Sequence, residues 1–541
     1  MTAQDPAGAR AVATDLTDAD RALLAPYVTE TTGPVFALTN LPETVKGALF
    51  ARYSRSPKSL RRLLVDEFLT DGGAIATGAG PGQAQADALY QRVLADYGDD
   101  SVAQLGGAHV AVEGASNILT KLLQWGRLAS YLEQSTRYIA YTDRPGGQWR
   151  YYTPPDVAAH PEVGPAYSRT LDRAFASYAQ MIPVLIAYWD AHVPTDDAPA
   201  AARQRAVRAR ALDSLRGLLP AATRSNVGIF ASGQAFEALL VRLIAHPLPQ
   251  AREAGERILS QLRLVIPAFL TRVDRPDRGL LHAQYLRDTE DATAEVARTT
   301  LGHADHGSSG TRVRLLEWDR DGEARVIAHA LWTASDRGYD EVRAVVDRMS
   351  AADRARALVA YTGDRSDRRY KPGRALETTT YTFEIVCDYG AYRDLQRHRM
   401  LTLQAQPLGV ALGWSLPEDV SEAGCGDLYA QVMSDSGGLY EQLAATVPLA
   451  GPYAVSLAHR IRFVMVINAR EAMHLIELRS QPQGHIAYRD VAQQMHQRIR
   501  EVGHTAIADM MQFVDHSTPT AGRLAAERRL EQRRTGDRNA R

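Results

Sequence analysis

The spacing of hydrophobic residues predicts a chain built mainly from helices, with a few strands between them. Three stretches alternate apolar and polar residues like strands, HVAVEG at 109–114, RVRLLEW at 312–318 and TFEIVCDYG at 382–390. Helical periodicity instead occupies 41–68, 84–97, 115–133, 165–192, 202–217, 234–246 and 252–272, and resumes near 339. This mixture predicts an α/β (α+β) fold in which sheets are flanked by helices.

The order of these elements repeats along the chain. HVAVEG and TFEIVCDYG are each followed by a short helical pattern, ASNILTKLLQWGR in the first half and AYRDLQRHR in the second. Each pair precedes a further helical segment, at 230–258 and 467–495. A repeat of this kind predicts two tandem homologous domains arranged as a pseudo-dimer. The predicted parts are a flexible lead-in at 1–30, domains at 31–295 and 296–520, and an Arg-rich tail at 521–541.

Composition changes this picture little. The chain has 541 residues, 45% of them hydrophobic, and a formal net charge of −1, so we expect neither nucleic acid nor a membrane as a partner. It shows no signal-peptide pattern and no apolar run of about 20 residues. Its two cysteines, Cys387 and Cys425, fit a reducing compartment and lack activating neighbours. We therefore expect a cytoplasmic protein with inert thiols.

Three minor patterns are interpreted as structural. The cluster of His303, Asp305 and His306 lacks a third partner at ligand spacing, so we predict no metal site. Glycines at 78, 80 and 82 match no phosphate-binding loop and predict an ordinary loop. The tail mixes Arg with Glu, which is typical of a solvated helix; a basic arm for a polyanion is the alternative.

The two halves carry complementary polar motifs. Only the first half has EQSTRY (133–138) and RGLLP (216–220), and only the second has RHR (397–399) and NAREAMHLIELR (468–479). At the matching positions the first half has WGR and SGQAFEALLVRL. The second half has Ala405, Gln406 and Pro407, and no arginine near Pro452. Each half thus holds what the other has lost.

Together these segments resemble the flavin-dependent thymidylate synthases. That family has a signature of the form RHRxxSxxxxSxRY, an ARxxLP segment and an NxRxxxHxxxxR helix, and its members are usually homotetramers of one small α/β domain. The resemblance implies FAD as cofactor, NADPH and methylenetetrahydrofolate as co-substrates, and reductive methylation of dUMP at C5 to give dTMP. Because each site in the family combines more than one subunit, it also implies one composite site per pair of halves and a homodimer equivalent to the tetramer.

The resemblance assigns roles to individual residues. It implies flavin binding by Glu377, Arg397, His398, Arg399, Asn468, Arg470 and His474. It implies binding of a small-molecule pyrimidine nucleotide by Glu133, Gln134, Ser135, Arg137, Arg216, Arg397 and Arg479. Arg479 is the implied catalytic residue, because a cation facing the ring stabilises a pyrimidine ionised at N3.

Local chemistry supports these roles and limits them. Arg137 and Arg216 can each bind a phosphate bidentately, provided that the 135–137 segment is extended. RHR is predicted as extended, with Arg397 and Arg399 on one side and His398 on the other. Simpler interpretations are a surface ion pair for Arg137, cations at a helix C-terminus for RHR, and a capping role for Arg479.

Three departures from the family pattern leave the substrate open. Thr402 stands where the signature has Ser, Asp394 near a position often held by Gln, and His485 where Gln is usual. An ionised Asp is only an acceptor, so it favours a different base edge from an amide. The alternatives are therefore C5 modification of another pyrimidine nucleotide, or a binding homologue without turnover.

Overall fold

The computed structural model describes residues 16–33, 35–53, 56, 58–69, 104–193, 199–302 and 311–517. They group into two compact units. The first unit draws on 1–113, 126–133 and 226–303, and the second on 114–125, 134–225 and 304–541. The predicted lead-in, the HADH cluster and the Arg-rich tail lie wholly or partly outside the described residues, as do the glycines at 78, 80 and 82.

The first unit contains a three-stranded sheet with the order β1-β3-β2. β1 is Gly107–Ser116, β2 is Ala129–Glu133 and β3 is Arg224–Ser232; the ends of β1 and β3 belong to the second unit. β2 runs antiparallel to β3, with Ala129 opposite Ala231. The helices α9 (Gly233–Ala245), α10 (Pro249–Leu262) and α11 (Gly279–Leu301) follow, and α9 packs against the other two.

The start of the first unit is also helical. It holds α1 (Asp18–Leu24), α2 (Glu43–Tyr53), α3 (Leu60–Leu63) and a π-helical turn, η1 (Leu64–Phe68). Thr17 caps α1 through a capping box with Asp20, and Leu24 is fully buried. The described part of the predicted flexible lead-in is therefore an ordered, capped helix.

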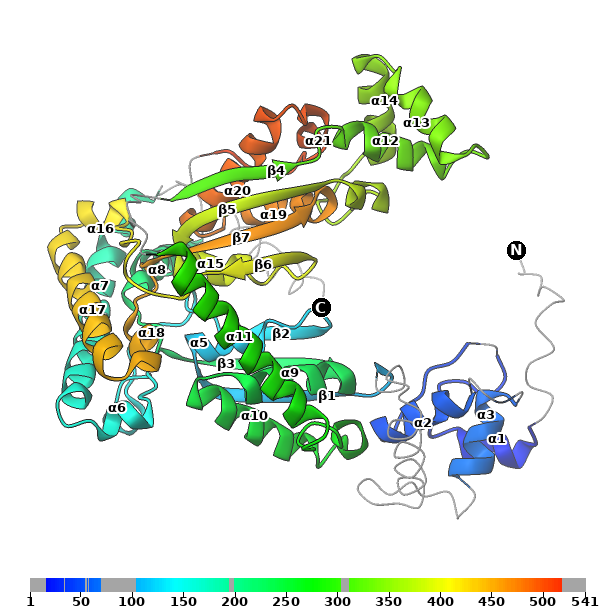
Figure 1. Cartoon of the computed structure of the whole chain (residues 1–541), viewed down its shortest axis with the longest axis horizontal. Helices are drawn as coiled ribbons and strands as arrows, with labels where there is room; N and C mark the ends of the chain where they lie inside the picture. Colours follow the sequence, from blue (N-terminus) through cyan, green and yellow to red (C-terminus); the bar gives the residue numbers. More distant parts are fainter. Residues whose placement is uncertain are drawn as a thin grey trace. The chain divides into compact units, whose positions relative to one another are not determined.

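The second unit is built on a four-stranded sheet with the order β4-β5-β7-β6 (Figure 1). The strands are β4 (Arg312–Trp318), β5 (Thr380–Asp388), β6 (Leu401–Ala405) and β7 (Arg460–Asn468). β7 pairs antiparallel with both β5 and β6. Two helices that follow β7, α19 (Ala469–Arg479) and α20 (Ile486–Glu501), pack on the sheet, α20 against β4 and β5.

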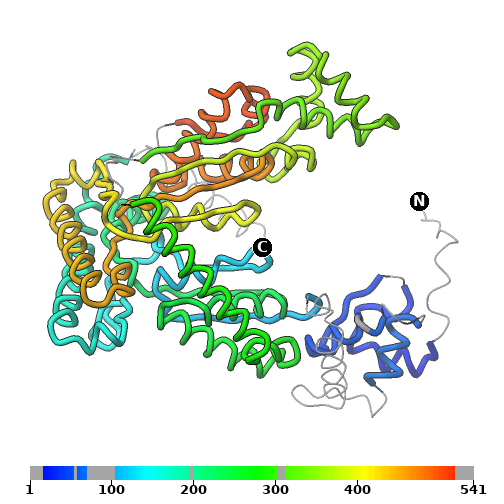
Figure 2. Tube along the Cα trace, in the orientation of Figure 1, coloured from blue at the N-terminus to red at the C-terminus, as the bar shows by residue number. Residues whose placement is uncertain are grey.

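Long helices complete the second unit. α7 (Val163–His192) packs against α8 (Ala200–Leu215) and α17 (Gly426–Thr446), and Figure 2 shows the traces of α7 and α17 side by side. The shorter helices are α5 (Asn117–Leu123), α6 (Pro155–Ala159), α12 (Gly322–Trp332), α13 (Tyr339–Asp347), α14 (Ala351–Thr362), α15 (Tyr389–Leu395), α16 (Glu418–Glu422), α18 (Gly451–Ala454) and α21 (Thr505–Asp509). Single 3-10 turns are η4 (Pro145–Gly147), η5 (Arg216–Leu218), η6 (Pro267–Leu270), η7 (Arg374–Thr378) and η8 (Pro448–Ala450).

The two halves of the chain share one topology, which confirms the tandem duplication and the fold class. In each half the last strand in sequence lies between the two strands that precede it, as β1-β3-β2 and β5-β7-β6. Equivalent backbone bonds also recur: Asn117 N–H donates to the Thr223 carbonyl at 3.0 Å, and Tyr389 N–H donates to the His459 carbonyl at 2.8 Å. The boundaries of the two compact units nevertheless differ from those of the two repeats, because residues 134–225 of the first half group with the second half.

Several predicted elements need correction. The helical pattern at 115–133 is α5 followed by β2, and α15 ends at Leu395, before RHR. Strands β3 and β7 were not predicted, although β7 buries Ile461, Phe463 and Met465 in strict alternation. The predicted helical segments at 230–258 and 467–495 overlap only the last residues of these strands, so most of each strand had no predicted element. No described helix is long and apolar enough to cross a bilayer.

Candidate active site

Arg137, from the first half of the chain, is held by a buried carboxylate in the second unit. It donates through Nε to Asp213 Oδ1 and through Nη2 to Asp213 Oδ2, both at 2.8 Å. Asp213 lies near the end of α8, one turn before Arg216. Such a two-pronged pair fixes the guanidinium plane, because both bonds must be satisfied together.

Arg216, also from the first half, meets residues of the second half. Its Nη1 donates to Asp394 Oδ2 at 3.2 Å, and the side chains are 4% and 10% exposed. Asp394 also pairs with Arg397, three residues on, at 3.2 Å. Burial alone raises the pKa of Asp394, but Arg397, Arg216, Arg479 and Arg137 together hold it well below its usual range. Asp394 is therefore an ionised bridge between arginines of both halves.

His398 is the buried centre of a second contact chain. Its Nδ1 lies 2.9 Å from Glu471 Oε1, and Arg479 Nε donates to its Nε2 at 3.0 Å. Burial, and then the Arg479 charge, hold the pKa of His398 well below its ordinary value. A neutral ring that accepts at Nε2 must carry its proton on Nδ1, which donates to Glu471. His398 thus orients Arg479.

Tyr488, on α20, joins the two contact chains. Arg137 Nη1 donates to its hydroxyl at 2.7 Å, and the guanidinium carbons of Arg137 and Arg479 lie 5.6 Å and 5.5 Å from its ring centroid. Both distances lie within the range of cation–π attraction. The predicted phosphate-binding arginine of one half and the predicted catalytic arginine of the other therefore contact one aromatic ring.

The cluster carries an excess of positive charge. Arg137, Arg216, Arg397 and Arg479 all act on Asp394 electrostatically, while Asp213 pairs with Arg137. The four arginines outnumber these two carboxylates, although a third carboxylate, Asp388, also interacts with Arg216 and Asp394. An anionic ligand would offset the remaining positive charge.

The remaining residues assigned to the flavin lie mainly on or beside α19. Asn468 caps α19, its Oδ1 accepting from Glu471 N–H at 2.9 Å, and Arg470 pairs with Glu377 at 3.2 Å. The His474 ring lies edge-on to His398 at 5.2 Å; burial lowers the pKa of His474 to about 4. The charges of Lys371, Arg399, Arg470 and Arg368 act on Glu471 or His474. This cationic surrounding fits a cofactor that carries a diphosphate.

Two predicted local conformations are wrong. Residues 136–138 form a turn, in which Ser135 Oγ accepts from Arg137 N–H at 3.2 Å. RHR lies between α15 and β6 and is not part of a strand, although His398 is buried and Arg397 exposed. In both places side-chain and backbone bonds favour the turn over an extended segment.

Of the residues at 133–135, which the resemblance assigns to nucleotide binding, only some lie near this cluster. Ser135 is adjacent to Arg137, and the Gln134 carbonyl accepts from Ser225 Oγ at 3.3 Å. Glu133 ends β2 in the first unit. The assignment of Glu133 to the site stays a prediction.

Comparison with known proteins identifies the family. The model of Thy1, the thymidylate synthase complementing proteins, matches residues 49–268 and 314–503. The chain belongs to the Thy1 family. Two matched segments, one in each half, accord with the duplicated topology.

Full-length relatives have the same overall extent. The chain is 36% identical over 525 residues to a UPF0159 protein of Chlamydia muridarum, covering 95% of this chain and 98% of that protein. It is 37% identical over 519 residues to one of Chlamydia pneumoniae (94% and 97%), and 29% over 515 residues to UPF0159 protein Ta1429 of Thermoplasma acidophilum (89% and 97%).

Two solved structures are similar over part of the chain. One is thymidylate synthase X (ThyX) from Helicobacter pylori with FAD and dUMP, at 16% identity and a TM-score of 0.28, covering 38% of this chain and 100% of that one. The other is the UMP/dUMP methylase PolB from Streptomyces cacaoi bound with 5-Br dUMP, at 15% and 0.32, covering 40% and 97%.

Three residues that hold the cluster of this Thy1 protein together, Asp213, Glu471 and Tyr488, were not predicted from the sequence. Asp213 precedes Arg216 by three positions on one helix face, a spacing that places both side chains on the same side. Glu471 follows the predicted Asn468 by three, the spacing of an N-cap. Tyr488 carried no motif, and only the packing of α20 brings it to the site.

Proposed function

We propose that the protein is a flavin-dependent thymidylate synthase, which reductively methylates dUMP at C5 with FAD, NADPH and methylenetetrahydrofolate. The observation that carries the proposal is the convergence of complementary halves. Arg137 and Arg216 of the first half and Arg397, His398 and Arg479 of the second meet through Asp394 and Tyr488. Each set is missing from the opposite half of the sequence.

The arginines of the first half bind the nucleotide phosphate in this proposal. A phosphate monoester is nearly dianionic at neutral pH, and the four arginines of the cluster outnumber Asp394 and Asp213. The donors of Arg137 are already bonded to Asp213, Tyr488 and the Gln483 carbonyl. Phosphate must therefore replace part of this set, so Asp213 lowers nucleotide affinity while it keeps Arg137 in place.

Arg479 acts on the pyrimidine ring. Burial lowers the pKa of its guanidinium, but arginine remains protonated in proteins. His398 and the Tyr488 ring fix its orientation. A fixed cation in a site of low dielectric constant stabilises the anionic ring formed during reaction. One well-placed group contributes about 3–4 kcal/mol to this stabilisation.

FAD would be held by the cationic residues around His474, namely Arg399, Arg470, Lys371 and Arg368, with Asn468 and Glu377 beside them. When bound, it supplies hydride transfer from NADPH and relays the one-carbon unit of the folate. His398 stays neutral and its Nδ1–H donates a hydrogen bond to Glu471, so His398 positions Arg479 without adding a charge of its own.

A second candidate substrate is another pyrimidine nucleotide, because Asp394 stands near the position of a family Gln. An acceptor-only carboxylate favours a base with an exocyclic amine, such as cytosine. In the structure both Asp394 oxygens already pair with arginines, Oδ2 with Arg216 and Oδ1 with Arg397. This occupancy favours dUMP.

The experiment compares dUMP with dCMP. Purified protein is first examined for flavin absorbance, then incubated with NADPH, methylenetetrahydrofolate and each nucleotide, and the products are separated by chromatography. We expect a yellow protein that forms dTMP from dUMP and sustains growth of a thymidine-requiring cell. Product from dCMP but not from dUMP would mean that dCMP is the substrate. A colourless protein that forms no product would overturn the proposal.

A further inference from the structure

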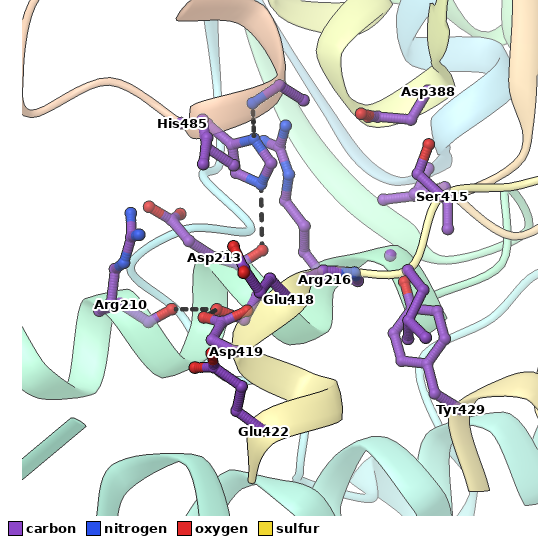
Figure 3. A pocket seen from close by; sticks show the side chains of 18 of the residues that line it. Arg210, Asp213, Arg216, Asp388, Ser415, Glu418, Asp419, Glu422, Tyr429 and His485 are labelled. Atoms are coloured by element: carbon purple, nitrogen blue, oxygen red, sulfur yellow. Dashed lines mark hydrogen bonds between the residues drawn. The ribbon is translucent and has the colours of Figure 1, made fainter. Parts of the chain in front are cut away.

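The cavity drawn in Figure 3 belongs to the proposed nucleotide site. It has a volume of about 540 Å³, and Asp213, Arg216 and His485 lie in its wall. None of the described residues assigned to the flavin lines this cavity. Beside α19 instead lies the loop 363–373, between α14 and η7. This segment, the cationic loop, carries four basic side chains, Arg365, Arg368, Arg369 and Lys371.

The cationic loop is bonded to α19 at both ends of that helix. Near the start of the helix, Arg470 Nε donates to the Pro372 carbonyl at 2.9 Å. Near its end, Glu477 accepts from Arg365, through Nη1 to Oε1 and through Nη2 to Oε2, both at 2.7 Å. Positions 470, 474 and 477 follow the spacing of one helix face. The loop therefore runs along the face of α19 that carries His474.

Arg365 uses all of its donors within the protein. Its Nε donates to the Tyr370 carbonyl at 2.6 Å and its Nη2 to the Arg368 carbonyl at 3.2 Å, so the loop closes around the guanidinium. Its Nη1 also donates to the Met510 carbonyl at 3.0 Å. The side chains of Arg365 and Glu477 are 2% and 1% exposed. A buried guanidinium bonded in this way cannot rotate without breaking several bonds at once, so it fixes the backbone around it.

The fixed backbone carries two cations toward the residues assigned to the flavin. The charges of Arg368 and Lys371 both act on His474. The Arg368 carbonyl is itself bonded to Arg365, and the carbonyls of the residues before and after Lys371 are both bonded. Lys371 is nevertheless exposed and Arg368 half-buried, so both side chains can meet a bound anion. Because the backbone is held beforehand, binding of that anion requires less ordering of the loop.

We propose that Arg365 is a positioning residue, which with Glu477 fixes the cationic loop against α19 and so sets the affinity for the diphosphate of a dinucleotide such as FAD. Arg365 itself does not contact the ligand, because it is buried and its donors are bonded within the protein. Its charge is balanced by Glu477, so its effect on binding passes through the loop. The choice of FAD as the ligand rests on the proposed function.

The test separates affinity from stability in three variants of the full chain. Arg365→Met leaves Glu477 unpaired and should lower the denaturation midpoint, whereas Arg365→Met/Glu477→Met removes both buried charges and should restore it. Arg365→Lys keeps the ion pair but has three donors in place of five, so it cannot replace all the bonds to the loop. All three variants should bind FAD about ten- to a hundredfold more weakly than wild type. Recovery of affinity together with stability in the double variant would show a purely structural role; if that variant does not fold, wild-type affinity in Arg365→Lys does so.

A matched control and a second probe complete the test. Arg272 and Glu237 form an ion pair of 2.9 Å in the first unit, with side chains 20% and 18% exposed, and Arg272→Met/Glu237→Met should leave FAD affinity unchanged. Calorimetry with inorganic pyrophosphate reports on the cationic loop without the flavin. If wild type binds pyrophosphate but not FAD, and the Arg365 variants lose pyrophosphate, the proposed cofactor is wrong and the positioning role holds. A wild type that binds neither probe, or Arg365 variants that bind as tightly as wild type, would overturn the proposal.

Discussion

At the residue scale, the site depends on buried pairs that couple the two halves of the chain. Arg137–Asp213 and Arg216–Asp394 are both buried, and removing one partner of such a pair costs about 3–5 kcal/mol because the other charge is left unpaired. Binding and stability must therefore be separated in any test of these arginines.

The first prediction concerns the phosphate. Arg137→Ala and Arg216→Ala should weaken dUMP binding about ten- to a hundredfold, the loss of a charged contact worth about 1.5–3 kcal/mol, and leave the flavin bound. Affinity by calorimetry and flavin absorbance are the measurements. The double variant Arg137→Ala/Asp213→Ala removes the orphaned charge and should regain stability but not affinity. Recovery of affinity in the double variant would show that Arg137 has only a structural role.

The second prediction concerns the division of labour between halves. His398→Ala or Arg399→Ala should release the flavin, whereas Arg479→Ala should keep both ligands and mainly lower kcat. The measurements are flavin absorbance and turnover. Arg127→Ala, at the matching position of the first half, is the control and should change neither. A loss of flavin from Arg127→Ala as large as that from Arg399→Ala would mean that the opposite site is active.

The third prediction concerns pH. His485 Nε2 donates to the Asp213 carbonyl at 3.1 Å, and its Nδ1 accepts from Ala487 N–H, so it is neutral. Burial, with Arg216 second, lowers its pKa to about 3, against about 6.5 when unfolded. The unfolded chain thus takes up a proton first as pH falls, and stability is present above pH ~6.5 and lost between ~6.5 and ~3.

His485→Gln should therefore flatten the pH dependence of stability. Between pH 4.5 and 7, the unfolding free energy of wild type should fall more steeply as pH decreases than that of His485→Gln, by about 1.4 kcal/mol per pH unit. Denaturant titrations measure both slopes. His282→Gln, an exposed position on α11, serves as control. Parallel curves for wild type and His485→Gln would refute a neutral buried imidazole.

At the element scale, the helices that follow the two central strands, α9 after β3 and α19 after β7, begin at equivalent positions of the repeat. Asn468 caps α19, and Ser232, at the same place in the repeat, caps α9 by accepting from Ala235 N–H at 3.3 Å. The cap is thus a property of the fold, and the amide of Asn468 is an addition of the second half.

The fourth prediction separates cap from cofactor. Asn468→Ala and Ser232→Ala should each cost about 1 kcal/mol, seen as a lower Tm, and Asn468→Ser should restore stability because a hydroxyl also caps. Flavin should be lost from both Asn468 variants, since neither keeps the amide donor, and retained in Ser232→Ala. Full flavin content in Asn468→Ser would leave the residue with a structural role alone.

At the scale of the whole molecule, duplication replaces a pair of subunits by a pair of repeats. If the fused chain follows the usual tetramer of single-domain family members, we expect it to form a homodimer. Light scattering on the eluting protein should give a mass twice 59.3 kDa. A 59.3 kDa particle that retains flavin and turnover would remove this fifth prediction.

Local patterns in the chain predicted the duplication, the main helices and most of the arginines and histidines of the contact cluster. These follow from periodicity and from motifs that are local in the chain, such as RHR and NAREAMHLIELR. It also carried the complementary losses, which imply that residues of the two halves act together.

Which groups are in contact, in contrast, depends on packing between distant elements. Asp213 and Tyr488 become partners of Arg137, and Glu471 becomes the partner of His398, through packing of α8, α20 and α19. No local pattern encodes contacts across 73 to 351 positions. Strands β3 and β7 are central because both neighbours pair with them, a choice made by the sheet. Asp394 is the clearest case: its sequence position suggested a group facing the base, but burial among arginines makes it a bridge, because a buried carboxylate is stable only beside opposite charge.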